Sequence, residues 1–446
     1  MAKQQVEEVQ PWQLYPAVEL LPAIKDKNQQ QSELIRARQN PGFPVAGGQV
    51  AHLLVNRAAQ GLFDYTQQGV AIRYLVDGNW EPSQPLPRDA GDAMLVALKI
   101  LAGANPQDRR SPQMGKVLIK KGREKLNLTL QTQGVPTGER VLVKIEPEKI
   151  PFDSLAALGM RDKMVDSFRG LLNGDGGLVV VSAPKGYGLS TSWRVAMEAA
   201  DKFVRDFQAF EPEGQPEPEV ININPNFYDK KNGPKPKEVL RSVLLKEPDV
   251  LVLPEIPDEE TLKEVCRQVS KGEKHAYTRI VADDAIDAVV KLVRQYPGAA
   301  ADLVGVLQGV LNQRLIRRLC ENCKQGFQPP PALLQRLGIP AGKVALLYQP
   351  FVPPPIEQQV DEKGRPAPIP PCPNCLGRGY FGRIAIFELL TPGPKLKKAL
   401  LKTADHGELR RIAKEEGHLD FQAEATLLIA RGLTSIDEVR RLFASK

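Results

Sequence analysis

Three patterns of hydrophobic and polar positions predict the secondary structure along the chain. Val70–Val76 carries an apolar residue at every second position and ends in the turn dipeptide Asp77-Gly78, which predicts a half-buried strand. Leu178–Val181 and Val250–Leu253 are unbroken apolar runs, typical of strands buried on both faces. Apolar residues at helical spacing predict helices over residues 51–60, 90–102, 164–172 and 190–207.

The order of these elements divides the chain into three parts. Residues 1–45, rich in Gln, Pro and charge, are predicted to be a flexible tail or short arm. Residues 46–150 combine helices and strands in a small α+β domain. From residue 151 to 446 strands and helices alternate, which predicts an α/β domain with a parallel sheet. Proline-rich stretches there bracket an inserted module at about 318–385, and a helical part is expected at 386–446.

Composition narrows the class of protein. The 446 residues include 60 Lys and Arg against 53 Asp and Glu, a net charge of +7 that suits a membrane surface or a nucleic acid. Basic residues are not interleaved with aromatic ones, so nucleic-acid binding is the weakest expectation. The apolar runs fall far short of the ~18–20 residues of a membrane span, and the N-terminus lacks a signal-peptide pattern. We therefore expect a cytoplasmic protein with reduced thiols.

Four of the five cysteines form two Cys-x-x-Cys pairs, Cys320/Cys323 and Cys372/Cys375. Two such knuckles supply the four thiolates that a tetrahedral zinc site prefers. The alternatives are two unrelated pairs or a redox dithiol, and the long interval between the pairs is unusual for a simple zinc ribbon. We predict a Zn²⁺ site, with Cys266 as a packing residue.

A glycine-containing loop joins the predicted strand at 178–181 to the helix that follows it. This order is the setting of a phosphate-binding loop, in which backbone N–H groups and a helix N-terminus point at an anion. The candidate nucleotide-binding residues of the loop are Lys185, Gly186, Gly188, Ser190 and Thr191.

The loop departs from the pattern G-x-x-x-x-G-K-[ST] at two positions. Ala183 stands at the first glycine and Leu189 at the lysine. That lysine supplies positive charge to the phosphates and the transition state, and leucine supplies none. Lys185 could swing inward to replace it, or it could be a solvated surface lysine, while Ser190 could still hold Mg²⁺. The substitution puts the binding of ATP and Mg²⁺ in doubt.

Six segments carry a resemblance to one family: Arg73–Gly78, Arg109–Gly115, Pro136–Glu139, Gly309–Cys320, Gly379–Arg383 and Gly432–Ser435. From about Val50 to its end, the chain resembles the secretion ATPases of type II secretion and type IV pilus assembly, the GspE/PulE/PilB group. The most specific segments, GVLNQRLIRRLC and GYFGR, flank the cysteine pairs.

The resemblance implies a PAS-like α+β domain at 46–150 and a RecA-like P-loop NTPase domain at 151–446 that carries the zinc module. It implies a hexameric ring on an inner-membrane platform, where ATP hydrolysis drives the assembly of pilins or pseudopilins. The expected partners are copies of this chain or an active paralogue in a mixed ring, together with membrane platform proteins. The chain would then be cytoplasmic or peripheral at the inner membrane.

Other motifs of the family are altered here. The E-D-P acidic box falls on Ile223-Asn224-Pro225 and has no carboxylate. At the Walker B motif Glu255 is retained after Pro254, either as the catalytic glutamate or as an ion-pair partner that stabilises the fold. The histidine of the His box is Val281, and His275 lies earlier in the same predicted strand.

These losses predict a degenerate, largely inactive ATPase domain in a structural or regulatory ring subunit. The alternative is an active motor with a rebuilt site, in which Lys185 or a neighbouring subunit's arginine replaces the lost charge. Arg109 and Arg110 fall where the resemblance implies arginines that reach nucleotide phosphates across the ring. Their other interpretation is a solvated basic surface or interdomain salt bridges.

Overall fold

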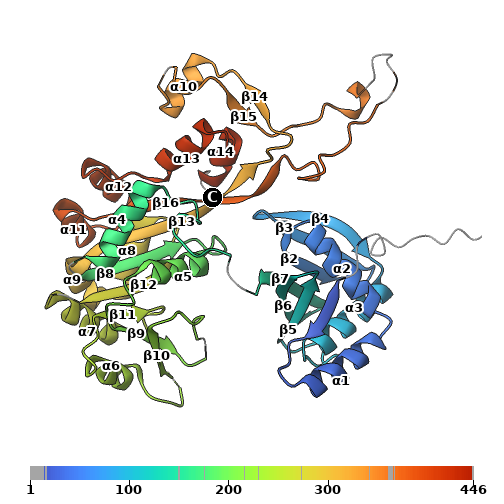
Figure 1. Cartoon of the computed structure of the whole chain (residues 1–446), viewed down its shortest axis with the longest axis horizontal. Coiled ribbons are helices and arrows are strands. Elements are labelled where there is room, and N and C mark those ends of the chain that lie inside the picture. The colour runs from blue at the N-terminus through green and yellow to red at the C-terminus, as the bar shows by residue number, and fades with distance from the viewer. Residues whose placement is uncertain are drawn as a thin grey trace, which may run out of the picture. The chain divides into compact units, whose positions relative to one another are not determined.

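The computed structural model describes Tyr15 and residues 18–148, 151–174, 176–214, 216–229, 231–272, 274–340, 342–359, 365 and 367–443. The chain divides into two compact units, Met1–Pro151 and Phe152–Lys446 (Figure 1). Each unit has its own seven-stranded sheet and its own hydrophobic core.

In the described residues, the first unit consists of an antiparallel sheet and three helices. The strands follow the order β1-β5-β6-β7-β2-β3-β4, and every neighbouring pair is antiparallel. Alternate side chains of the strands are buried and pack with the helices into one core, as expected of a sheet with one covered face. The elements are β1 (Glu19–Pro22), α1 (Lys27–Arg38), α2 (Phe43–Val55), β2 (Ala58–Tyr65), β3 (Val70–Val76), β4 (Asn79–Leu86), α3 (Arg88–Leu101), β5 (Gln113–Lys121), β6 (Glu124–Val135) and β7 (Gly138–Pro147).

The prediction of a tail or arm over residues 1–45 is corrected for the described residues 18–45. β1 pairs with β5 and buries Leu20, and Asp26 caps α1 by accepting a hydrogen bond from the backbone N–H of Gln29 at 2.8 Å. Leu34 and Ala37 are the buried residues of α1. The helix packs on the core through these two side chains, although most of its residues are polar. The rest of the predicted tail lies outside the described residues, Tyr15 excepted.

The second unit is built on a mostly parallel sheet. The strands follow the order β10-β9-β11-β12-β8-β13-β16, parallel as far as β13, with β16 antiparallel to β13. The seven strands are β8 (Gly177–Ala183), β9 (Phe207–Pro212), β10 (Ile223–Tyr228), β11 (Val250–Leu253), β12 (His275–Val281), β13 (Leu307–Leu319) and β16 (Tyr380–Leu390).

Helices cover both faces of this sheet. Val179 and Val181 of β8 pack toward α4 and α5, whereas Leu178 and Val180 pack toward the core that contains α6, α7, α8 and α9. A strand buried on both faces explains the unbroken apolar run in the sequence. These helices are α4 (Asp162–Asn173), α5 (Leu189–Ala199), α6 (Pro236–Leu244), α7 (Glu259–Ser270), α8 (Ala285–Gln295) and α9 (Ala300–Val306), with the 3-10 turn η2 (Pro297–Ala299) before α9.

Smaller elements complete this unit. Between β13 and β16 lie β14 (Gln325–Phe327), α10 (Pro331–Leu337), β15 (Leu347–Gln349) and the 3-10 turn η3 (Ile356–Gln358). β14 and β15 form a separate two-stranded sheet. The helices after β16 are α11 (Pro394–Leu400), α12 (His406–Glu415), α13 (Phe421–Ala430) and α14 (Ile436–Phe443).

Several predicted element boundaries are wrong for tertiary reasons. The helix predicted at 190–207 ends at Ala199, because Asn173 accepts a hydrogen bond from the N–H of Asp201 at 3.0 Å and fixes a turn there. The helical part predicted at 386–446 begins only after β16, since residues 386–390 extend the ladder with β13. Such long-range pairings leave no local sequence pattern.

Candidate functional site

The glycine loop leaves β8 at the buried Ala183 and enters α5 at Leu189, so the predicted strand and helix flank it. Gly186 and Gly188 have φ angles of +85° and +90°, in the left-handed region that favours glycine. A Cβ atom on Gly188 would lie 2.7 Å from Nε2 of Gln313. Gly188 is therefore required both by backbone conformation and by the close approach of β13.

Gln313 of β13 ties the loop to the sheet. Its Nε2 donates to the carbonyl oxygen of Tyr187 at 2.8 Å, and its Oε1 accepts a hydrogen bond from Ser192 Oγ on α5. The Gln313 side chain is 2% exposed, so both bonds are shielded from water. The loop therefore has internal hydrogen-bond partners that do not depend on a bound phosphate.

The position of the missing lysine is used for packing. Leu189 is half-buried and packs against the apolar cluster that contains Val181 and Trp193. Lys185 and Ser190 are exposed, and Thr191 is half-buried. The loop retains its glycine conformation, while the lysine position is apolar.

Two of the altered motifs lie at the carboxyl ends of their strands: Glu255 is exposed after the buried Pro254, and Val281 is 49% exposed at the end of β12. Asn224, by contrast, is exposed at the amino end of β10, opposite Gln208 of β9, so the predicted acidic-box segment does not lie at the end of the sheet that carries the glycine loop. In the parallel pair β12–β8, Val281 is opposite Ala183, whereas His275 is opposite Gly177. His275 therefore lies at the end of the sheet away from the glycine loop and does not replace the missing histidine.

Arg109 and Arg110 belong to the first unit, in the connection between α3 and β5. Both are exposed, and Arg109 Nη1 lies 3.5 Å from a carboxylate oxygen of Asp92. A Cβ on Gly134 would lie 2.8 Å from backbone atoms of both arginines, so the turn between β6 and β7 backs closely onto this loop.

A buried ion pair anchors the arginine loop to the core of the first unit. Lys99 of α3 and Glu139 of β7 are 1% and 4% exposed, and Lys99 Nζ lies 2.5 Å from Glu139 Oε1. The same ammonium group donates to the carbonyl oxygen of Asp108 at 2.7 Å. The backbone next to Arg109 is thereby fixed from inside the domain, while the guanidinium groups of Arg109 and Arg110 face solvent.

The two cysteine pairs converge. All four Sγ atoms lie within 4.8 Å of one another, with 3.8 Å between Cys320 and Cys372 and 3.6 Å between Cys323 and Cys375. A tetrahedral zinc ion 2.3 Å from each sulfur separates the sulfurs by about 3.8 Å. The four thiols therefore fit a metal ion such as Zn²⁺ in both donor type and spacing.

Hydrogen bonds favour the thiolate form of Cys372, whereas burial raises the pKa of Cys320 and of Cys323. Asn322 Nδ2 donates to Cys372 Sγ, and the N–H of Gly379 donates to Cys375 Sγ, each at 3.3 Å. Hydrogen bonds from the N–H of Cys375 and from Asn322 lower the pKa of Cys372 to about 6. Gly379 has a φ of +72°, and a Cβ there would lie 2.5 Å from Cβ of Pro350. The long interval between the pairs is bridged because β13 and β16 are antiparallel neighbours.

The segment Gly432–Ser435 packs against the base of this cysteine module. Thr434 Oγ1 donates to the carbonyl oxygen of Arg317 at 2.8 Å, and Ser435 Oγ lies 2.7 Å from the hydroxyl of Tyr380. Ser435 caps α14 by accepting a hydrogen bond from the N–H of Glu438 at 3.1 Å. The Glu438 carboxylate pairs with Arg317 instead of completing a capping box. These contacts give the segment a structural role.

A polar pair near α5 was not predicted from the sequence. Arg279 of β12 donates to both carboxylate oxygens of Glu217, at 2.8 and 2.5 Å, and its guanidinium lies 5.7 Å from the ring centre of Trp193. Proline on either side of Glu217 marks a restricted loop, but nothing local indicates a partner 62 residues away.

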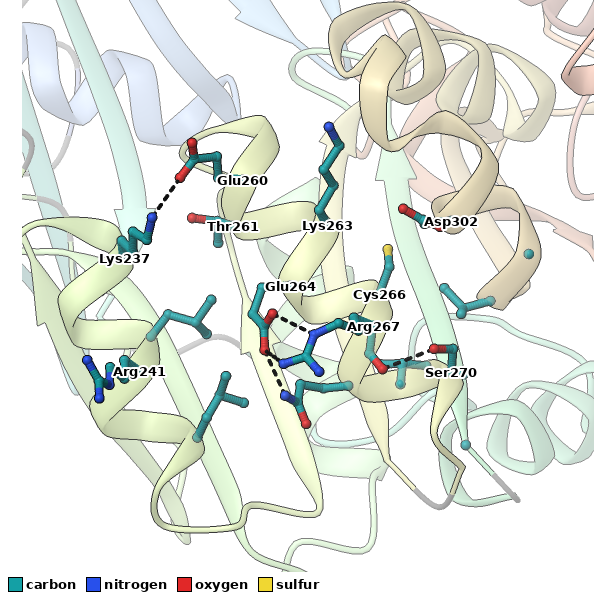
Figure 2. Close-up of a pocket in the computed structure, with 18 of the residues that line it drawn as sticks. Lys237, Arg241, Glu260, Thr261, Lys263, Glu264, Cys266, Arg267, Ser270 and Asp302 are labelled. Carbon is teal, nitrogen blue, oxygen red and sulfur yellow. Dashed lines mark hydrogen bonds and ion pairs between the residues drawn. The ribbon is translucent and has the colours of Figure 1, made fainter.

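A cavity on the second unit lies apart from the glycine loop. It has a volume of about 1420 Å³ and is lined by α6, α7 and α9 (Figure 2). Two ion pairs, Lys237–Glu260 and Arg267–Glu264, neutralise much of its charge.

No helix of the described residues is long and apolar enough to cross a membrane.

Comparison with known proteins identifies relatives over most of the chain. The family described as "Type II/IV secretion system protein" matches residues 43–441. The type IV pilus assembly ATPase PilB of Thermus thermophilus is 28% identical over 378 residues, covering 84% of this chain and 40% of that protein. PilB of Pseudomonas aeruginosa is 23% identical, covering 94% and 70%, and type II secretion system protein E of Xanthomonas campestris is 24% identical, covering 91% and 68%.

Solved structures share the fold. The ATPase DotB of Legionella pneumophila has a TM-score of 0.55 at 13% identity and covers 89% of this chain and 94% of its own. The pilus retraction motor PilT, solved with bound ADP, has a TM-score of 0.50 at 15% identity and covers 89% and 96%. The chain therefore has the α/β fold of these ATPases.

Proposed function

The chain belongs to the type II/IV secretion system protein family, and we propose that it is a ring subunit with little or no ATPase activity of its own. In this proposal the first unit is a PAS-like domain and the second a RecA-like domain. The ring consists of six copies or is shared with an active paralogue. It assembles at the cytoplasmic side of a membrane platform and supports pseudopilin or pilin assembly or type II protein secretion.

The half-buried Leu189 carries the proposal. A lysine at this position would place its charge at the phosphates of a nucleotide, whereas the leucine packs with Val181 and Trp193. Phosphates bound at the loop would meet backbone N–H groups without the positive charge that stabilises the transition state.

The missing acids and histidine add to this loss. Val281 offers no imidazole at the carboxyl end of β12, and Asn224 and Pro225 offer no carboxylate, although they lie at the amino end of β10. Removal of one transition-state donor costs about 10²–10³-fold in rate. Glu255 alone remains of the hydrolytic set, so turnover should be near background.

Steady-state ATP hydrolysis of the full chain tests the proposal. We expect no turnover above that of the Glu255→Gln variant, which keeps the shape of the side chain and removes its charge. ATP turnover by the wild type that is abolished in Glu255→Gln would refute the proposal. Titration of Mg²⁺ and nucleotide would show separately whether binding survives without hydrolysis.

The second candidate is a motor with a rebuilt site. The retained left-handed glycines and the exposed Glu255 favour it, because the loop keeps a conformation that could hold phosphates. In that case Lys185→Ala would also abolish turnover, since Lys185 would supply the missing charge. An unchanged rate in Lys185→Ala would show that Lys185 does not supply the missing charge and would count against the rebuilt motor.

We also propose that Cys320, Cys323, Cys372 and Cys375 hold one Zn²⁺ ion. When bound, the ion would cross-link the end of β13 to the segment before β16 and would have a structural role. Metal analysis of the reduced protein should give one zinc per chain, with Cys320→Ser as the control, and folded protein that contains no bound zinc when purified reduced would overturn the assignment.

A further inference from the structure

We propose that Arg279 is a latent anion-binding site beside α5, and that this chain fills it with its own Glu217. The ligand class is a phosphate or carboxylate anion, which the Glu217 carboxylate replaces. The inference rests on the proposed function in one respect: a subunit without a working nucleotide site must keep this end of its sheet stable without a ligand.

The geometry of Arg279 is that of an anion receptor. Its guanidinium makes two parallel hydrogen bonds to one carboxylate, the arrangement in which arginine binds carboxylate and phosphate groups. The Trp193 ring packs near the guanidinium, and the side chains of Arg279 and Glu217 are 22% and 19% exposed. A charge so shielded needs an anionic partner.

Arg279 also lies close to the glycine loop. It is opposite Val181 in the β12–β8 ladder, two residues before Ala183, where the loop begins. Trp193, against which it packs, belongs to α5, the helix that begins at the loop. An anion bound to Arg279 would therefore lie beside the helix that a nucleotide-binding loop uses.

Glu217 is held in place by its own loop. Its backbone N–H donates to Glu211 Oε2 at 2.9 Å, and burial raises the pKa of Glu211. Pro216 and Pro218 restrict the backbone on both sides of Glu217. The carboxylate is thus positioned before it meets Arg279, which lowers the entropy cost of forming the pair.

Space for an external anion adjoins the pair. A cavity of about 470 Å³ is lined by Glu217 and by Trp193, Arg194 and Met197 of α5, and also by the carboxylates of Glu211 and Glu219. Arg194 places a second guanidinium at this cavity, and no carboxylate partner for it is found among the described residues. If the Glu217 charge were removed, Arg279 would lose its counter-charge beside this cavity, where an anion would meet Arg194 and would have to tolerate the Glu211 and Glu219 carboxylates.

Thermal unfolding of the full chain with added inorganic phosphate tests the inference. Without phosphate, Glu217→Gln should lower the melting temperature by about 2–4 °C, because the amide leaves the Arg279 charge uncompensated. Millimolar phosphate should restore at least half of that loss and should leave the wild-type chain unchanged. Glu213→Gln, an exposed glutamate of the same loop that does not line the cavity, is the matched control and should behave as wild type.

The double variant Glu217→Gln with Arg279→Gln identifies the receptor, because phosphate should no longer raise its melting temperature. A second arm with ATP in place of phosphate separates a nucleotide from a free phosphate as the better ligand. Equal stabilisation of wild type and Glu217→Gln, or a response that survives loss of Arg279, would overturn the inference. ATP hydrolysis by the wild type would refute the proposed function. It would not by itself refute the anion site, which the melting temperatures of the variants test separately.

Discussion

Gly188 shows how one residue can be kept for packing after the chemistry around it has changed. Its φ of +90° is costly for any other residue, and its missing Cβ leaves room for the amide of Gln313. Gly186, two residues earlier, has a similar φ of +85°, but a Cβ added there would meet no other part of the chain within 4 Å. A comparison of Gly186 with Gly188 therefore separates the requirement for a positive φ, which both share, from the requirement for space, which applies to Gly188 alone.

We predict that Gly186→Ala lowers the free energy of unfolding by about 1 kcal/mol and Gly188→Ala by about 2–3 kcal/mol. The additional loss at Gly188 arises because the new methyl group displaces Gln313 and breaks its bond to Tyr187, worth about 1 kcal/mol. Urea unfolding followed by circular dichroism measures both. Equal losses, or additivity with Gln313→Ala in a double-mutant cycle, would contradict the role given to Gln313.

At the scale of elements, α14 is attached to β13 through a buried charge. The Glu438 side chain is 0% exposed and accepts hydrogen bonds from Arg317 on β13 and Arg441 on α14. Burial alone would raise the pKa of the Glu438 carboxyl, but hydrogen bonds from Arg441 and Arg317 outweigh it and hold the pKa below its usual value. The C-terminal helix is therefore attached most firmly when Glu438 is ionised.

Glu438→Gln should lower the free energy of unfolding at pH 7 by about 3–5 kcal/mol, because it leaves a shielded Arg317 without its counter-charge. A lowered folded-state pKa stabilises the protein above the unfolded pKa of about 4.3, and this stabilisation is lost as pH falls through the folded value. The difference between wild type and variant should thus shrink below about pH 4. Urea titrations at pH 7 and at acid pH measure it.

Asp437→Asn is the matched control for this prediction. Asp437 is the preceding residue, is 77% exposed and pairs with Arg440 at 3.4 Å. An exposed pair of this kind contributes about 0.5 kcal/mol or less, so the control should be near wild type at both pH values. A Glu438→Gln effect that is no larger than the control, or that does not change with pH, would refute the assignment.

At the scale of the whole molecule, local sequence patterns predicted individual strands well, but they did not predict which strands and side chains contact one another. Val70–Val76 and Val250–Leu253 have the bounds expected from alternation and from an unbroken apolar run. The convergence of the four thiols followed from the spacing of the two pairs. β1 was not predicted because it is short and has few apolar residues, and it is a strand only through its pairing with β5.

The candidate site was predictable where it follows a motif and hidden where it depends on tertiary contacts. Gly188 and Leu189 could be placed from the strand, loop and helix order. The pair Arg279–Glu217 could not, because its two residues are 62 positions apart and lie on a strand and a loop with no shared pattern. Burial of Leu189, which decides how its position is used, also depends on neighbours from other elements.

The path of the chain between the two cysteine pairs has a consequence for how sequences of this kind can change in length. The excursion leaves β13 at Leu319 and returns to β16 at Tyr380, its partner in the ladder. Since the entry and exit points are held together by the sheet and by the converged thiols, lengthening the excursion adds only the small entropy of a longer closed loop, about 0.6 kcal/mol per doubling. Insertions in the excursion are therefore nearly neutral for folding, whereas deletions that remove Ile339 or Leu347 would lose the apolar cluster that these residues form with Ile429 of α13.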